Sequence, residues 1–246
     1  MSKLISRREL LAGMPAAGSV LLTGCRESLP PTYGSLFDVS NALTFASQRL
    51  LLRKQPLARE FGREMISKHF PAINTTNPDS PRYQVLRASS FFQWRLPVEG
   101  LVASPGEFSL QDLKSLPSRT QVTQHNCEQG WSAIAEWTGV QLVRVLQEVE
   151  TLPQARYVVF HTVDGWWDSL DMFDALHPQT LLAYGMNGGK LPVQHGAPVR
   201  LRVERQLGYK NLKYLSRIEL TDRLDEIEDG TGAVGAAYGY SWYAGI

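Results

Sequence analysis

The chain has 246 residues, of which 43% are hydrophobic and 20% are charged. This balance supplies enough apolar side chains for a sizeable core and excludes an intrinsically disordered chain. The formal net charge of +1 gives no reason to expect a polyanionic partner, so nucleic acid binding is not predicted.

The first 24 residues have the layout of an export signal. Arg7 and Arg8 precede an uncharged stretch that runs from residue 10 to Cys25. A positive end, an apolar middle and small residues are typical of signal peptides. The paired arginines favour the twin-arginine route, and a general secretory signal with two incidental arginines is the alternative. The stretch is too short and too rich in Gly, Ala and Pro for a convincing membrane span.

Leu22-Thr23-Gly24-Cys25 resembles a bacterial lipobox, in which the cysteine becomes the acylated first residue of the mature protein. We therefore expect a protein of the periplasm or cell envelope that is lipid-anchored through Cys25. A plain signal peptide that happens to end before a cysteine is the alternative. If Cys25 is acylated, Cys127 is a lone thiol, which needs burial or a ligand in an oxidising compartment. If Cys25 is free, the two cysteines could form a disulfide.

Residues 25–66 are predicted to form a linker and an N-terminal helical arm. The stretch before residue 42 is rich in Pro, Ser and Gly, and helix-like hydrophobic spacing follows from residue 43 to residue 70, broken by Pro56. Pro71, Pro78 and Pro81 then predict an irregular, extended crossing.

The remaining chain predicts more strand than helix. Helices are expected after Ser109, as a capped start that Pro117 stops, and from Leu142 to Val149. Strands are expected over residues 91–98, 157–163, 199–203 and 216–220, and Asn187-Gly188 predicts a hairpin. This mixed α+β pattern has no regular βαβ order, and no dinucleotide or Walker fingerprint is present.

The segment around Cys127 carries the most specific motif. Cys127 is followed by Gly130-Trp131-Ser132 and then by Trp137-Thr138-Gly139-Val140. Further segments that belong to the same pattern are Lys68-His69-Phe70-Pro71, Ala183-Tyr184-Gly185-Met186-Asn187-Gly188, His195-Gly196-Ala197-Pro198-Val199-Arg200 and Gly208-Tyr209-Lys210-Asn211-Leu212-Lys213-Tyr214. Together they resemble the molybdopterin-binding domain of sulfite oxidase-like oxidoreductases, with the periplasmic sulfoxide-reductase catalytic subunits as the nearest branch.

The resemblance implies a sulfite oxidase-type molybdopterin-binding fold with mixed sheets and irregular helices, placed here over residues 67–246. It also implies a Mo-molybdopterin cofactor with Cys127 as the metal ligand and the catalytic centre. A soft thiolate is the side chain that suits this metal. Taken without its context, Cys127 could equally be a buried structural cysteine.

The resemblance places Arg200 and Lys213 at contacts with the pterin phosphate, with Lys210 as a further candidate. Arginine offers a planar fork and lysine a compact charge, while Gly208 would let the backbone approach the cofactor. Solvated strand and loop charges are the alternative reading of these cations.

Three more residues, His69, Thr162 and His195, are candidate cofactor contacts, although a lone histidine is often structural. Trp166-Trp167 could line the mouth of the pocket or belong to the core. His161 and His177 stand in no motif and are interpreted as structural or surface residues.

The function predicted from the resemblance is that of an exported molybdopterin-dependent oxidoreductase. It would transfer an oxygen atom or electrons to or from a small substrate, with a sulfoxide favoured. Sulfite oxidation is an alternative that the missing arginine-rich pocket around Cys127 disfavours, and a cofactor-free binding lipoprotein on the same fold is another. Because there is no haem-binding segment and no room for a dimerisation domain, we expect a monomer served by a membrane or periplasmic haem electron-transfer partner.

Overall fold

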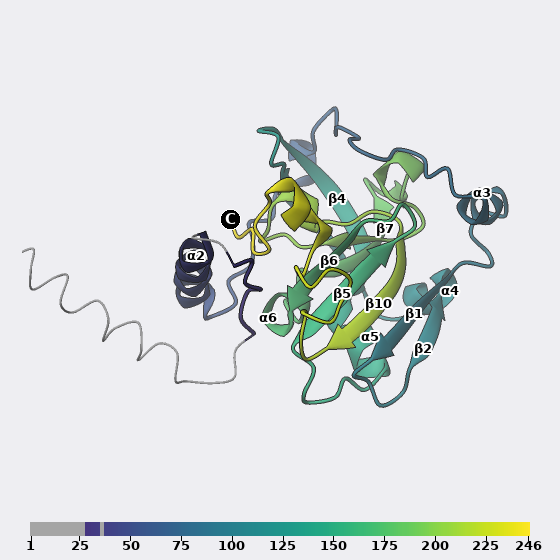
Figure 1. Cartoon of the computed structure of the whole chain (residues 1–246). Helices are drawn as coiled ribbons and strands as arrows, with labels where there is room; N and C mark the ends of the chain where they lie inside the picture. Colours follow the sequence, from purple (N-terminus) through teal and green to yellow (C-terminus); the bar gives the residue numbers. More distant parts are fainter. Residues whose placement is uncertain (1–27, 35–36) are drawn as a thin grey trace, which may run out of the picture.

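The computed structural model describes residues 28–34 and 37–246. The predicted signal peptide and the lipobox cysteine Cys25 lie outside the described residues. Two five-stranded sheets form the body of the molecule (Figure 1).

The first sheet has the strand order β2-β1-β10-β5-β6. Its strands are β1 (Arg95–Gly100), β2 (Gly106–Ser109), β5 (Tyr157–Thr162), β6 (Trp167–Asp171) and β10 (Leu215–Thr221). All pairs are antiparallel except β1 and β10, which run parallel in the register Val98↔Ile218.

The second sheet joins β3 (Ser118–Asn126), β4 (Ser132–Gln141), β7 (Leu181–Met186) and β8 (Gly189–Lys190), and β9 (Arg200–Arg202) pairs with β7. The nine-residue β3 and ten-residue β4 pair from Ser118↔Val140 to Asn126↔Ser132. The far end of this long hairpin is the turn that holds Cys127.

One apolar core lies between the sheets and brings their inward-facing side chains together. Leu96, Phe160 and Ile218 of the first sheet belong to the same buried cluster as Val140 and Leu182 of the second. Because successive strand residues point to opposite faces, β1 contributes Leu96 and Val98 to this core and β5 contributes Val158 and Phe160. The core therefore fixes the two sheets as one body.

Short helices connect the strands. The α-helices are α2 (Phe37–Leu52), α3 (Pro81–Ala88), α4 (Leu110–Ser115), α5 (Leu142–Glu148) and α6 (Met172–Ala175). Single-turn 3-10 helices are η1 (Arg63–Met65), η2 (Val193–His195), η3 (Gly208–Lys210) and η4 (Val234–Tyr238). The predicted strand-rich α+β class is confirmed.

Several predicted elements are confirmed in detail. Ser109 caps α4 through a reciprocal bond pattern with Asp112, and Leu142, Val145 and Leu146 are the buried face of α5. The hairpin at Asn187-Gly188 has positive φ at both residues, as a tight turn of this kind requires.

Two predictions were wrong at their boundaries. The helix predicted over residues 43–70 begins at Phe37 and ends at Leu52, and residues 57–70 form irregular chain with an isolated bridge at Glu60 and the turn η1. The amide of Phe61 donates to Val122 O at 2.9 Å and that of Ser67 to Ile134 O at 3.0 Å, so this segment lies against the β3–β4 hairpin instead of forming a helix. The strand predicted from residue 91 starts at Arg95, because Ser90 and Phe91 have positive φ and form a turn.

The helix α3 was not predicted at all, because prolines at residues 71, 78 and 81 suggested continuous irregular chain. Pro81 instead occupies the first turn of α3, where its missing N–H would have no helical partner in any case.

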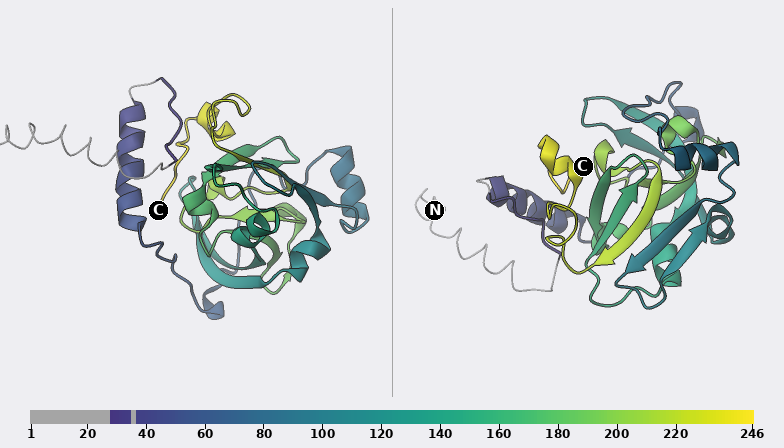
Figure 2. Two further views of the ribbon diagram at one scale, coloured as in Figure 1. Left: turned by 90° about the horizontal axis from the view of Figure 1, so that it is seen from below. Right: turned by 45° about the vertical axis from the view of Figure 1, so that its right-hand side comes forward.

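Helix α2 stands at the edge of the body, beside the C-terminal segment (Figures 1 and 2). The chain from residue 28 to residue 34 runs alongside it in both figures. Across residues 28–34 and 37–246, the structure contains no helix with the length and apolarity needed to span a membrane.

Candidate active site

Cys127 lies in the turn that joins β3 to β4. Its amide donates to Trp131 O at 2.9 Å, and the amide of Gly130 donates back to Cys127 O at 3.1 Å. Gly130 has φ +89°, a conformation that a side chain would strain, so the glycine of the motif is needed for this turn. The cysteine is free, 6% exposed and 3.5 Å from Glu128 Oε2. Burial raises the pKa of its thiol to about 11.

Beside this turn lies a cavity of about 490 Å³. Glu128 and Gln129, which directly follow Cys127, form part of its wall. The other walls come from residues 70–75, from the turn after β5, from the η2 and η3 segments, and from the C-terminal tail. The cavity is thus assembled from segments that lie more than 100 residues apart in the chain.

Arg200, at the start of β9, forms one wall of the cavity and is 4% exposed. Its guanidinium donates to His195 O at 2.9 Å and to Asn211 O at 2.8 Å, while its Nε has no partner. Burial and the neighbouring Arg202 lower the pKa of Arg200 to about 9. A buried cation that is bonded only to carbonyl oxygens, and that keeps one of its own N–H groups without a partner, is suited to binding an anionic ligand.

Lys213 lies on the same wall. Its Nζ donates to Ile73 O at 2.7 Å, to Thr75 O, and to Gln194 O at 3.3 Å. Burial and the charge of Arg200 lower the pKa of Lys213 to about 8. Within the described chain, no carboxylate forms an ion pair with Arg200 or Lys213. Two cations that form no ion pair therefore line one cavity, which Asp164 also lines.

Gly208 forms the wall opposite the cysteine turn. A Cβ at this position would lie 2.8 Å from His125 Nε2 and 3.1 Å from Glu128 Oε2. His125 accepts from Arg202 at its Nδ1, at 2.9 Å, and burial lowers its pKa to about 2. The ring is therefore neutral, and its Nε2 carries the proton on the side of Gly208.

His195 lines the cavity, and its pKa is lowered to about 4 by burial and by the charges of Arg200 and Lys213. His69 does not line it. His69 borders an adjoining hollow of about 500 Å³ that shares His195 and the segment beginning at Phe70 with the first cavity. The structure thus places His195 between two cavities and His69 in the second.

Two predicted site residues lie behind the wall. Thr162 Oγ1 is 2.6 Å from Asp164 Oδ1 and 2.7 Å from Trp166 O, so it shapes the turn that brings these two residues to the cavity. Lys210 is 1% exposed and pairs with Asp168, while its Nζ also donates to Trp242 O at 2.8 Å. The structure therefore makes Lys210 the anchor of the C-terminal tail and does not bring its amine to the cavity.

The tail brings aromatic rings to the cavity. Tyr238 stacks on Trp166 with centroids 5.7 Å apart, and Tyr240 stacks on Tyr209 at 4.7 Å. All four rings line the cavity. Tyr209 OH donates to Ser241 O at 2.6 Å, which holds the tail in place. Trp166 therefore lines the pocket, whereas Trp167 is a core residue.

The two histidines without a motif are structural. His177 is 2% exposed, its Nε2 lies 3.2 Å from Pro56 O, and its Nδ1 accepts the amide of Gln179 at 3.2 Å. Burial lowers the pKa of His177 to about 4. His161 forms contacts with Arg217 and Glu219 on the first sheet.

Sequence reasoning missed His125, Tyr209 and the Ile73–Thr75 segment as wall residues. His125 could have been found, because it stands two residues before Cys127 on the opposite side of a tight turn. Tyr209 could have been found from its place next to Gly208. The segment at residues 73–75 carries no motif, and only the contacts of Lys213 bring it to the site.

These features fit a molybdopterin cofactor. One free thiol of the soft donor type lies in the turn beside the cavity, directly before the wall residue Glu128, although Cys127 does not itself line the wall. Arg200 and Lys213, two cations that form no ion pair with any described residue, lie on the wall. Gly208 lines the cavity and lets the backbone approach His125 and Glu128 so closely that a Cβ would overlap them. Among the described residues, no group of three or more His, Cys, Asp or Glu is arranged to hold a metal ion, so a metal here would depend on Cys127 and on donors carried by the cofactor.

Comparison with known proteins gives the same assignment. Residues 83–227 match the family model described as the oxidoreductase molybdopterin binding domain. A protein of Azospira oryzae, assigned by inference as protein-methionine-sulfoxide reductase subunit YedZ1, is 35% identical over 244 residues, which cover 99% of this chain and 89% of that protein. The protein-methionine-sulfoxide reductase catalytic subunit MsrP of Xanthomonas axonopodis pv. citri is 30% identical over 235 residues, covering 89% and 70%.

Among solved structures, the chain is similar to the sulfane dehydrogenase SoxCD from Paracoccus pantotrophus. The TM-score is 0.51 at 25% sequence identity, and the match covers 58% of this chain and 40% of that one. The sulfite oxidase-type fold expected from the sequence is confirmed. The chain therefore belongs to the oxidoreductase molybdopterin-binding family and is a molybdenum-dependent oxidoreductase.

Proposed function

We propose that this protein is an exported, lipid-anchored reductase that converts methionine sulfoxide residues of other proteins to methionine. The names of the two relatives supply the substrate class. The observation that carries the proposal to this chain is the cavity itself, which Arg200, Lys213 and a cluster of aromatic rings line, with the free thiol of Cys127 in the turn immediately beside it.

Four residues at the cavity would bind the cofactor. Cys127 would supply the protein thiolate to the metal, and Arg200 and Lys213 would hold the phosphate of the pterin. Gly208 leaves the space that the cofactor needs beside His125. When bound, the molybdopterin centre would supply the two-electron oxygen-atom chemistry.

The aromatic rings suit a sulfur-bearing side chain of the methionine type. The four stacked rings form an apolar, polarisable wall, and sulfur makes favourable contacts with ring edges. Tyr238 is 67% exposed, so part of this wall faces outward, where a side chain presented by another protein could reach it. The overall reaction takes up two electrons and two protons per sulfoxide and releases a thioether and water.

The electrons must come from a separate protein. We propose a membrane or periplasmic haem protein as the donor and a monomer as the working form. The export route and the acylation of Cys25 rest on the sequence of the first 25 residues.

A metal and substrate assay tests the proposal. The protein is matured in a host that makes molybdopterin, and its molybdenum content is measured together with reduction of peptide methionine sulfoxide by a reduced dye. We expect a ratio near one molybdenum per chain, and loss of both metal and activity in Cys127→Ser. Cys25→Ser is the matched control and should retain both. Oxidation of sulfite without reduction of any sulfoxide would assign the alternative reaction.

A further inference from the structure

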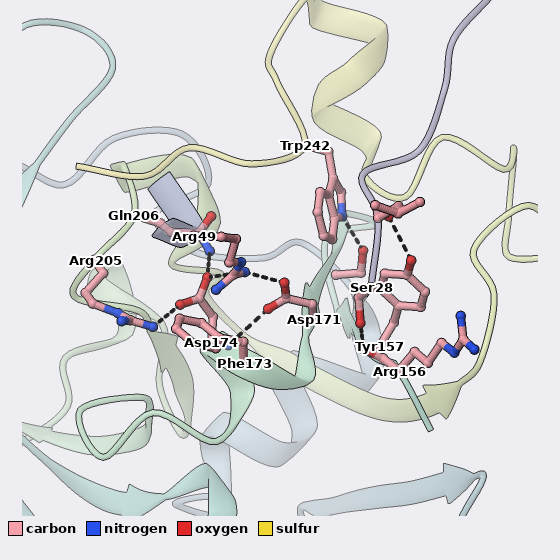
Figure 3. A network of polar contacts seen from close by, with 12 residues as sticks. Ser28, Arg49, Arg156, Tyr157, Asp171, Phe173, Asp174, Arg205, Gln206 and Trp242 are labelled. Atoms are coloured by element: carbon pink, nitrogen blue, oxygen red, sulfur yellow. Dashed lines mark hydrogen bonds and ion pairs between the residues drawn. The ribbon is translucent and has the colours of Figure 1, made fainter. Parts of the chain in front are cut away.

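Helix α2 is fixed to the body by its inward face (Figure 3). Arg49 is 9% exposed and pairs with Asp171 and, at 3.3 Å, with Asp174. Its guanidinium also lies over the ring of Phe173, 4.1 Å from the centroid. Asp174 is held in turn by Arg205. Phe45, also on this face, packs against Trp242 and Tyr243. The buried ionic network and this ring thus hold α2 in a defined orientation.

The outward face of α2 is apolar. Val39, Leu43, Leu50 and Leu51 are 69%, 64%, 63% and 76% exposed. Ser47 lies between them, and its hydroxyl donates to Leu43 O at 2.8 Å, so it presents little free polarity. We call these five residues the outer face of α2.

This arrangement departs from the usual one. A surface helix normally turns its only apolar stripe to the core and its charges to water, whereas α2 buries Arg49 together with Phe45 and still exposes four large aliphatic side chains. Exposed apolar residues that occur singly need no explanation. Four on one face of a 16-residue helix form a patch of the kind that marks an interaction surface.

The chain that precedes α2 indicates what covers this face. Ser28 Oγ donates to Arg156 O at 3.0 Å, and Tyr157 OH donates to Leu29 O at 2.7 Å, so the chain is fastened to the body from Ser28 onward (Figure 3). The lipobox residue Cys25 stands three residues earlier, a reach of about 10 Å. A bilayer that held Cys25 would therefore lie close to the chain that runs alongside α2.

The charges at the end of α2 match a membrane surface. Arg53 and Lys54 are exposed and follow the last residue of the helix. From residue 39 to residue 52 the helix has no acidic residue, and its only basic residue is the buried Arg49. An apolar face flanked by basic residues is the pattern of helices that lie in the headgroup region of anionic membranes.

We propose that the outer face of α2 lies in the boundary between headgroups and acyl chains of a lipid bilayer, with Arg53 and Lys54 against anionic headgroups. The acyl chain at Cys25 and α2 together would then hold the body at two points in one orientation. This inference rests on the proposed anchor for the position of the bilayer, and it does not depend on the substrate of the enzyme.

Vesicle binding tests the proposal. The full chain carrying Cys25→Ser is used throughout, so that acylation does not contribute and the N-terminal segment is the same in every variant. Co-sedimentation measures partition into vesicles of phosphatidylcholine with about 30% phosphatidylglycerol. Leu43→Glu/Leu50→Glu should weaken partition about tenfold or more, since two leucines lose their burial and two charges are added.

A matched control is available on the other side of the molecule. Val85 on α3 and Phe92 after it are 66% and 83% exposed, and α3 lies far from α2 in Figure 1. Val85→Glu/Phe92→Glu adds the same charge and should leave partition within about twofold of the parent, because a change smaller than about 0.4 kcal/mol is expected from charge alone at this distance. Arg53→Glu/Lys54→Glu should remove only the part of the binding that depends on phosphatidylglycerol.

A second measurement does not depend on added charge. With Leu50→Trp, the tryptophan emission should shift to shorter wavelength when vesicles are added, and thermal unfolding of every variant should match that of the parent. Equal partition of the Leu43→Glu/Leu50→Glu variant and the parent would overturn the proposal. So would a lipid-free dimer that this variant dissolves, which would assign the face to a second copy. If the variant bound vesicles as the parent does but was released from native membranes, the outer face of α2 would be assigned to contact with a membrane protein. None of these results touches the sulfoxide reductase assignment, which the metal and substrate assay tests separately.

Discussion

Replacing Arg49 with methionine measures how firmly the arm is held to the enzyme body. Methionine keeps the apolar contacts with the Phe173 ring and removes the charge, which leaves Asp171 buried at 3% exposure with no cation. Breaking a buried pair from one side costs about 3–5 kcal/mol, because the remaining charge is uncompensated. We expect this loss at pH 8 in the free energy of unfolding from urea titration. Arg53→Met, the same change at an exposed position, should cost less than about 0.5 kcal/mol.

The loss should depend on pH. Burial raises the pKa of Asp171 to about 6 even with Arg49 present, and removing Arg49 takes away a cause that lowers this pKa. The folded variant therefore takes up a proton at a higher pH than the unfolded chain, whose carboxyl titrates near 3.9. The loss relative to the parent is complete above the folded pKa of the variant. It shrinks as the pH falls towards about 6, where Asp171 takes up a proton in the parent as well, so it should be small at pH 5. Asp171→Asn in the Arg49→Met background should restore stability at pH 8. An equal loss at both pH values would refute the reasoning.

Three further predictions concern the site and the core. Gly208→Ala should lower the free energy of unfolding by about 1–3 kcal/mol, because its Cβ would overlap the ring of His125, and it should also lower the molybdenum content. Gly106→Ala, where the atom nearest to the new Cβ is 4.0 Å away, should change neither quantity. The folded pKa of His177, about 4, lies below its unfolded value of about 6.5, so the folded chain binds fewer protons between these values. Stability should therefore fall as the pH drops through that window. His177→Gln should flatten the plot of melting temperature against pH on its acid side, and an unchanged plot would contradict this. Trp166→Leu breaks an aromatic stack at the cavity and should raise KM for peptide methionine sulfoxide more than it lowers kcat; a fall in kcat alone would count against a role in substrate binding.

The cysteine segment could be interpreted from the sequence because its parts are local. Cys127, Gly130 and Trp131 belong to one turn, and a turn depends on residues a few positions apart. The capping box at Ser109 and the hairpin at Asn187 were predictable for the same reason.

The cations show where local reasoning ends. Lys210 and Lys213 are three residues apart and were predicted together, yet only Lys213 lines the cavity. Lys210 turns to Asp168, a buried carboxylate on the first sheet, because an unpaired carboxylate there would cost more than the site gains from a third cation. No spacing in the sequence announces that pairing.

The sequence by itself determined the family, the cysteine turn and the helical nature of the arm, since these depend on residue type and short-range pattern. Tertiary structure alone decided which cations face the cavity, that the tail carries rings to it, and which face of α2 turns outward. Helix α2 has apolar residues on both sides, so its periodicity cannot fix its orientation. The buried pair of Asp171 and Asp174 draws Arg49 inward, and the four aliphatic side chains are thereby left on the surface.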